Sequence, residues 1–138
     1  MNMIIRKSLL AVVALAAGAT ALAHHSAVQF DFAKTVTYTG TVKSFQAINP
    51  HMHMIVQLKD AKGTRDVHFE GHSTNNMYRS GYRKGMVKIG EQMTVSAAPF
   101  RDGTEGGYVV GAKVQDGRFF GSKGRGAADE VRRQAEGR

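Results

Sequence analysis

The chain has 138 residues, a formal net charge of +8, and no cysteine or tryptophan. The lack of cysteine excludes a disulfide framework, so stability has to come from packing and backbone hydrogen bonds. This length is sufficient for one small domain with a modest core.

The first 23 residues have the three parts of a cleavable secretory signal peptide. Arg6 and Lys7 precede an uncharged apolar run over residues 9–22, and residues 21–23 place alanine at both positions that a signal peptidase recognises. The run is shorter than the roughly 20 residues that span a bilayer. We therefore expect a periplasmic protein whose mature chain begins at His24 and is not an integral membrane protein. The alternative is an uncleaved N-terminal anchor.

Five segments of the mature chain alternate apolar and polar residues with the two-residue period of half-buried strands. These segments are residues 35–43, 51–59, 65–70, 93–97 and 108–114. The second and third segments flank the turn sequence of residues 60–63 and should form a hairpin. Gly40 predicts a bulge or bend in the first strand. On the last strand, one face is expected to carry Tyr108, Val110, Ala112 and Val114.

A short helix is expected after the third strand, because Ser73 or Thr74 can cap its start and Gly81 can end it. Three strands, a helix and two more strands are the element order of an OB-fold, a five-stranded Greek-key barrel. The sequence thus predicts an all-β, OB-fold-like domain over residues 24–118 with one short helix. Another small β-sandwich or roll is the alternative. Residues 119–138 are expected to form a flexible basic tail in which nothing must be buried.

The histidines give the most informative chemical pattern in the sequence. The register that aligns the apolar faces of the hairpin places His53 opposite Glu70. The same register places His51 opposite His72. Imidazole and carboxylate ligands suit zinc, copper or nickel. The hairpin therefore supplies five candidate metal ligands: His51, His53, His68, Glu70 and His72. The alternative is a hairpin whose polar side chains only face solvent.

Cleavage after Ala23 would add a sixth candidate ligand, His24. Its free α-amine and its imidazole can chelate one metal ion together. The amine has an unperturbed pKa of about 7.7–8.0, so copper can displace its proton at neutral pH. An imidazole from His51 would complete a T-shaped, three-nitrogen site suited to Cu(II). Copper is therefore the expected ion, ahead of zinc.

Several short motifs of the mature chain resemble a family of small exported bacterial proteins of unknown function. They include His24-His25-Ser26, Asn49-Pro50-His51 and Phe69-Glu70. The resemblance covers about residues 24–118 and singles out His24, His51 and Glu70. It implies location and fold, and supplies no established activity. Met52-His53 departs from the aromatic residue that commonly follows Asn-Pro-His in that family.

Two functions without catalysis fit the sequence better than an enzyme, because it contains no phosphate loop and no Ser-His-Asp arrangement in a recognisable context. The first is a periplasmic protein that holds, delivers or senses a metal ion. The second is an OB-fold binding module for a small solute, a glycan or an envelope protein, using the hairpin face and the loop of residues 101–107. Export argues against a nucleic-acid partner despite the basic charge.

Overall fold

The computed structural model describes residues 27–123 and 126–136, which form a mostly β domain. Its elements are β1 (Val36–Gln46), β2 (His53–Asp60), β3 (Gly63–Glu70), α2 (Thr74–Arg79), β4 (Gln92–Pro99), β5 (Gly106–Val114), β6 (Phe119–Gly121) and α3 (Ala127–Ala135). The predicted strands and the short helix after the third strand are confirmed. The predicted signal peptide and His24 lie outside the described residues. No helix in the described part of the chain is long and apolar enough to cross a bilayer.

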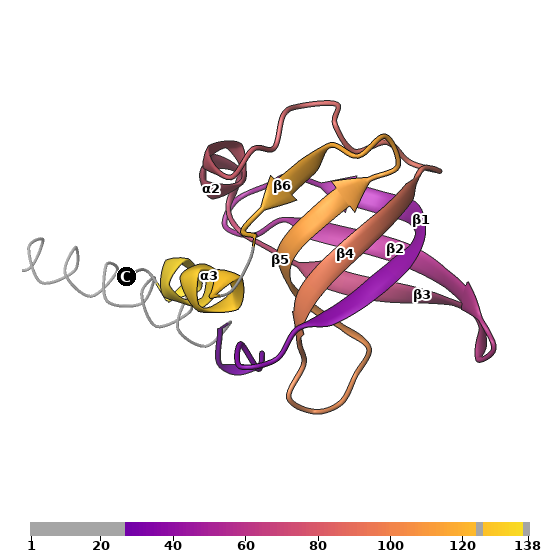
Figure 1. Cartoon of the computed structure of the whole chain (residues 1–138), viewed down its shortest axis with the longest axis horizontal. Helices are drawn as coiled ribbons and strands as arrows, with labels where there is room; N and C mark the ends of the chain where they lie inside the picture. The colour runs from indigo at the N-terminus through magenta and orange to yellow at the C-terminus, as the bar shows by residue number, and fades with distance from the viewer. Residues whose placement is uncertain (1–26, 124–125, 137–138) are drawn as a thin grey trace, which may run out of the picture.

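All six strands belong to one sheet, in the order β3-β2-β1-β4-β5-β6 (Figure 1). Neighbours in this order are antiparallel. In addition, β3 pairs in parallel with β5. The five strands β3, β2, β1, β4 and β5 are therefore each paired with a neighbour on both sides. The long first strand makes this closure possible, because its first half pairs with β4 and its second half with β2.

Gly40 lies in β1 close to the point where pairing passes from β4 to β2. A Cβ atom at this position would lie 2.3 Å from the carbonyl oxygen of Gln57 and 2.8 Å from a methyl group of Val56. The predicted irregularity of the strand occurs slightly later, as a shift of register between Val42 and Ser44. Glycine is therefore required here by the close approach of β2 to β1.

The main core contains the apolar faces that the strand pattern predicts. Its buried members include Met52, Met54, Val56, Leu58, Val67, Phe69, Met93 and Val95. Both hairpin methionines are 1% exposed and fill the core. Because each inward residue alternates with an outward one, these buried side chains direct the hairpin histidines to the opposite face of the sheet.

A second core contains Ala27, Phe30, Phe32, Ala98, Tyr108, Val110 and Val131. The prediction that one face of β5 carries all four apolar residues is therefore wrong. Ala112 and Val114 lie in the main core, whereas Tyr108 and Val110 lie in the second. The cause is a bulge: Ser96 pairs with Gly111 and Ala97 with Val109, which leaves Val110 as the extra residue and reverses the alternation.

The prediction that nothing after Arg118 is buried is also wrong. Strand β6 pairs with β5, and Val131 of α3 is 1% exposed within the second core. A single buried valine among charged and small residues is too weak a pattern to reveal a docked helix from the sequence.

Candidate functional site

The hairpin has the predicted register, with His53 opposite Glu70 and Ile55 opposite His68. The ladder of paired residues ends at His53 and Glu70. Beyond it, the Met52 amide donates to the His72 carbonyl (3.1 Å), and the Gly71 amide donates to the Met52 carbonyl (2.9 Å). Met52 thus bonds two successive residues, in place of the predicted direct pairing of His51 with His72.

The five predicted ligands of the hairpin fall into two groups. His51 and His72 lie beside Tyr108 of β5, whereas His53, His68 and Glu70 line a cleft. Within residues 27–123 and 126–136, no three His, Cys, Asp or Glu side chains are close enough to hold a metal ion. The five residues therefore do not surround one common space. His51 and His72 contact the ring of Tyr108, and the other three line the cleft.

The imidazole pair, His51 and His72, packs edge-on against the ring of Tyr108. The ring centroids of His51 and His72 lie 6.3 Å and 5.3 Å from that of Tyr108. His72 is 7% exposed, and its Nδ1 atom lies 3.0 Å from the Tyr108 hydroxyl. Its Nε2 atom is buried and has no hydrogen-bond partner among the residues that the structure describes. Such an atom is costly in a folded protein and is typical of a position that a ligand completes.

The hydrogen bond of His51 determines its tautomer. Its Nδ1–H donates to the carbonyl oxygen of Gly71 at 3.2 Å. A carbonyl can only accept, so the proton of the neutral ring is on Nδ1 and the lone pair is on Nε2. In both imidazoles, Nδ1 has a protein partner, and His51 has the tautomer that ligates through Nε2.

Burial keeps His72 and Tyr108 neutral. Desolvation is the main cause that lowers the pKa of His72 to about 4; the neighbouring His51 contributes in the same direction, and Glu130 opposes the shift. Desolvation also raises the pKa of Tyr108 far above its usual value, with a further contribution from Glu70. At neutral pH His72 is therefore an uncharged imidazole, which is the form that binds metal ions.

The second group of predicted ligands lines a cleft of about 340 Å³ on the outer face of β1, β2 and β3. Its walls are Ser44, Gln46, His53, Met54, Ile55, His68, Phe69, Glu70 and Phe100. Phe100 comes from the loop after β4 and packs against Phe30, with ring centroids 4.9 Å apart. The cleft therefore combines hydroxyl, amide, imidazole and carboxylate groups with one aromatic wall.

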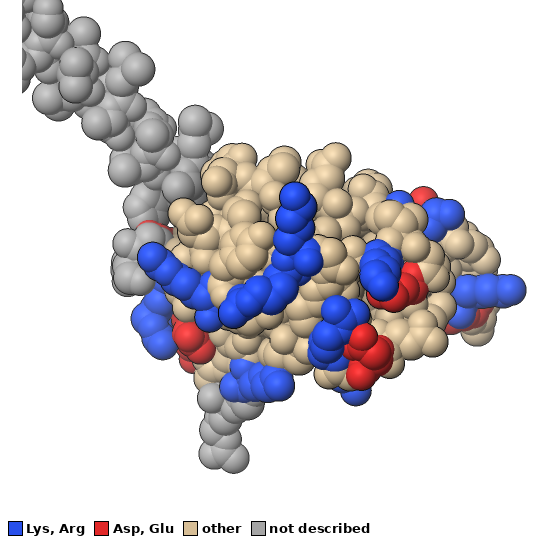
Figure 2. Space-filling view, turned by 90° about the horizontal axis from the view of Figure 1, so that it is seen from above, with Lys and Arg blue, Asp and Glu red and all other residues tan. Residues whose placement is uncertain are grey.

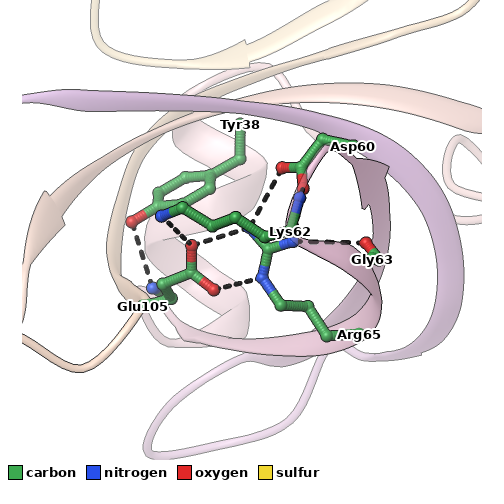
Figure 3. A network of polar contacts seen from close by, with 7 residues as sticks. Tyr38, Asp60, Lys62, Gly63, Arg65 and Glu105 are labelled. Carbon is green, nitrogen blue, oxygen red and sulfur yellow. Dashed lines mark hydrogen bonds and ion pairs between the residues drawn. The ribbon is translucent and has the colours of Figure 1, made fainter.

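A network around Arg65 connects the loop after β4 to the tip of the hairpin (Figure 3). Arg65 donates to both carboxylate oxygens of Glu105 and to both of Asp60, and Lys62 also approaches Glu105. Hydrogen bonding to the guanidinium lowers the pKa of both carboxyl groups. Nearby, the Gly106 amide donates to the Tyr38 hydroxyl at 3.2 Å. These bonds fix the end of the loop that begins with Phe100.

Tyr108 is the site residue that the sequence did not identify. The strand pattern predicted a core residue, and the ring of Tyr108 does lie in the second core, but its hydroxyl also contacts His72. Its hydroxyl reaches His72 because β3 and β5 pair in parallel, with Glu70 opposite Tyr108. Nothing in the sequence indicates that β3 pairs with β5, since Tyr108 is far from Glu70 and His72 along the chain.

The fold and the site together define a small, mostly β domain with a tyrosine-backed imidazole pair and an adjoining polar cleft. The chain belongs to the Family of unknown function (DUF6152), whose model matches residues 11–109. The match includes every hairpin ligand candidate and Tyr108, and ends before β6 and α3. No curated protein matches the chain.

Two solved structures are similar to part of the chain. One is a mitochondrial single-stranded DNA binding protein from S. cerevisiae, Rim1, with 10% identity and a TM-score of 0.46 over 59% of this chain and 93% of that one. The other is a ZRD-deleted mutant of TiaS in complex with agmatine, with 13% identity and a TM-score of 0.41 over 59% of this chain. The chain spans 21% of the length of TiaS in that structure.

Proposed function

We propose that the mature periplasmic chain binds one copper ion through His51, His72 and the N-terminal His24. The observation that carries the proposal is the buried Nε2 of His72, which has no partner in residues 27–123 and 126–136, beside a second imidazole of fixed tautomer. In metalloproteins, a histidine ligand typically forms a hydrogen bond through one ring nitrogen, here Nδ1, and binds the metal through the other, here Nε2. We also infer that the closed succession of β1 to β5 is an OB-fold barrel.

The N-terminal ligand of this proposal is close in the chain to the core beside the pair. Ala27 packs in the same core as Tyr108, and three peptide units separate it from His24. An extended chain of three residues spans at most about 10 Å, so His24 has to lie within that distance of Ala27. The amine and imidazole of His24, added to two imidazoles, favour Cu(II) over zinc through their nitrogen-rich donor set. In this proposal His53, His68 and Glu70, which line the separate polar cleft, are not ligands of the ion.

The test is a Cu(II) titration of the chain that begins at His24, in competition with a chelator of known affinity. His51→Gln and His72→Gln are each expected to weaken binding by more than about 100-fold, since removing even a supporting group of a metal ligand costs 10–100-fold. An added N-terminal glycine should weaken binding similarly and remove the amine nitrogen signal from the electron paramagnetic resonance spectrum.

His68→Gln is the matched control, because His68 is an exposed histidine of the same hairpin. It should leave affinity nearly unchanged. Equal affinity with and without the added glycine would exclude the role of His24. Equal losses in the His68 and His72 variants would exclude the imidazole pair as the specific site.

The polar cleft supports a second function, the binding of a small solute or a glycan without metal. It lies on the strand face that OB-folds commonly use for ligands, and Phe100 gives it an aromatic wall. With chelator present, a bound solute should shift the amide resonances of Ser44 and His53, and Gln46→Ala should weaken binding. If no solute or glycan shifts these resonances while copper still binds, this second function is excluded.

A further inference from the structure

A basic surface lies at the end of the molecule formed by α2, the loop of residues 80–91 and the turn between β5 and β6. We define it by six exposed side chains: Arg79, Arg83, Lys84, Lys88, Arg118 and Lys123. Figure 2 views this end and shows Lys and Arg side chains spread across it, with fewer acidic side chains between them. None of these residues belongs to the imidazole pair or to the polar cleft.

The loop and the turn adjoin one another. A hollow of about 420 Å³ is lined by Arg83, Lys84 and Met86 from the loop and by Arg118 and Phe119 from the turn and β6. Asp116 of the turn lies close enough to Lys88 for that lysine to help lower its pKa. A second hollow is lined by both Arg79 and Lys123. The six basic residues therefore form one continuous surface rather than separate charges.

Acidic groups neutralise this surface only in part. Asp116 pairs with Arg118, Glu130 lines the hollow beside Lys123, and Glu91 is half-buried at the end of the loop. Over residues 79–91 there are four basic side chains and one acidic side chain. The surface thus retains a net positive charge, although Arg83 also donates to the carbonyl oxygens of Tyr78 and Tyr82.

Two large apolar side chains are exposed among these charges. Ile89 is 63% exposed and Tyr78 is 39% exposed. Ile89 follows Lys88 directly and precedes Gly90, which has a left-handed φ of 89° and donates its amide to the Val42 carbonyl at 2.8 Å. An apolar side chain held outward beside lysines is typical of proteins that rest in a membrane interface.

We propose that this basic surface docks on an anionic phospholipid bilayer, with Ile89 entering the headgroup region and the six basic side chains facing lipid phosphates. A bilayer requires no fixed shape, which suits a surface of long side chains on a loop and a turn. Single-stranded nucleic acid instead prefers open aromatic rings in a basic groove. Here the ring of Phe119 is covered by the amine of Lys123, 4.1 Å from its centroid, and the partly exposed ring of Tyr78 packs edge-on against Tyr82.

The experiment measures binding of the chain from His24 onward to vesicles with and without phosphatidylglycerol. Both cores are formed by residues from Ala27 to Val131, so this chain retains them without the apolar run of residues 9–22. Each basic residue near an anionic surface contributes roughly fivefold in partitioning. The double variant Lys84→Gln/Lys88→Gln should therefore bind anionic vesicles roughly 25-fold more weakly. Ile89→Ser should weaken binding several-fold and leave its salt dependence unchanged.

The matched control is Lys34→Gln/Lys59→Gln, which removes the same charge from exposed positions outside the surface. It should retain nearly all binding. An equal loss in this control would show attraction by net charge alone and overturn the proposal. So would equal binding to phosphatidylcholine vesicles, or binding of an oligonucleotide without binding of anionic vesicles. Unchanged Cu(II) titration of the loop variants would show that their effect is independent of the proposed copper site.

Discussion

His72 is the residue at which burial and hydrogen-bonding capacity conflict most strongly. One ring nitrogen is bonded to Tyr108, and the other is buried without a partner in the described part of the chain. A solvent-facing histidine of a hairpin would show neither property, as His53 and His68 illustrate by their exposure. This difference separates His72 from the other histidines of the same hairpin.

Burial of His72 makes the stability of the metal-free protein depend on pH. The pKa of His72 is about 4 in the folded protein and 6.5 in an unfolded chain. Between these values the unfolded chain binds more protons, so the free energy of unfolding falls as pH decreases from about 6.5 to about 4. The loss attributable to His72 is at most about 3 kcal/mol.

Urea unfolding in chelator at a series of pH values measures this dependence. His72→Gln should flatten the curve in that window, and His68→Gln should leave it as in the parent protein. A parent protein equally stable at both ends of the window would contradict the effect of burial.

The sequence predicted part of the site because strand alternation and hairpin register are local properties. They placed His53 opposite Glu70 and all five candidate ligands on one hairpin. They could not divide the ligands into two groups, because Tyr108 comes from a strand that is remote in the chain. The contacts of Tyr108 depend on the parallel pairing of β3 with β5, which only the tertiary structure shows.

At the scale of elements, β1 determines how the sheet closes, because it pairs with both β4 and β2. Gly40 permits the close approach of β2 to β1. Gly40→Ala should destabilise the protein by about 1–3 kcal/mol, because the new methyl group meets the backbone oxygen of Gln57, which cannot move alone. The midpoint of urea unfolding measures this loss. Lys43→Ala, at an exposed position of the same strand, should change stability by less than about 0.5 kcal/mol. Similar midpoints for the two variants would contradict a close approach at Gly40.

The elements were predictable where the apolar period was regular, and were missed where it was interrupted. Strand β2 alternates along its apolar part and β4 does so from Gln92 to Ala97, and the inward faces of these stretches were predicted correctly. In β5 the bulge at Val110 exchanges the two faces in mid-strand, which no fixed period can represent. β6 and α3 are short, and α3 buries only Val131 completely, so their pattern was too weak.

At the scale of the whole molecule, the proposed copper site depends on the predicted cleavage of the signal peptide after Ala23. Intact-mass analysis of protein recovered from the envelope fraction should give the mass of residues 24–138. Ala23→Tyr should leave the signal peptide attached, because a large residue is not accepted at that position. A mature chain that begins at His25 would contradict the proposal, since the chelating residue would have been removed.

The loop after β4 offers a place for insertion. Its two ends are fixed, by the stacking of Phe100 on Phe30 and by the bonds of Glu105 to Arg65, whereas residues 101–104 are exposed. Lengthening a loop between fixed ends costs little chain entropy. A foreign epitope introduced between Asp102 and Gly103 should therefore be displayed beside the polar cleft without unfolding the domain, which makes this loop the natural position for grafted recognition sequences.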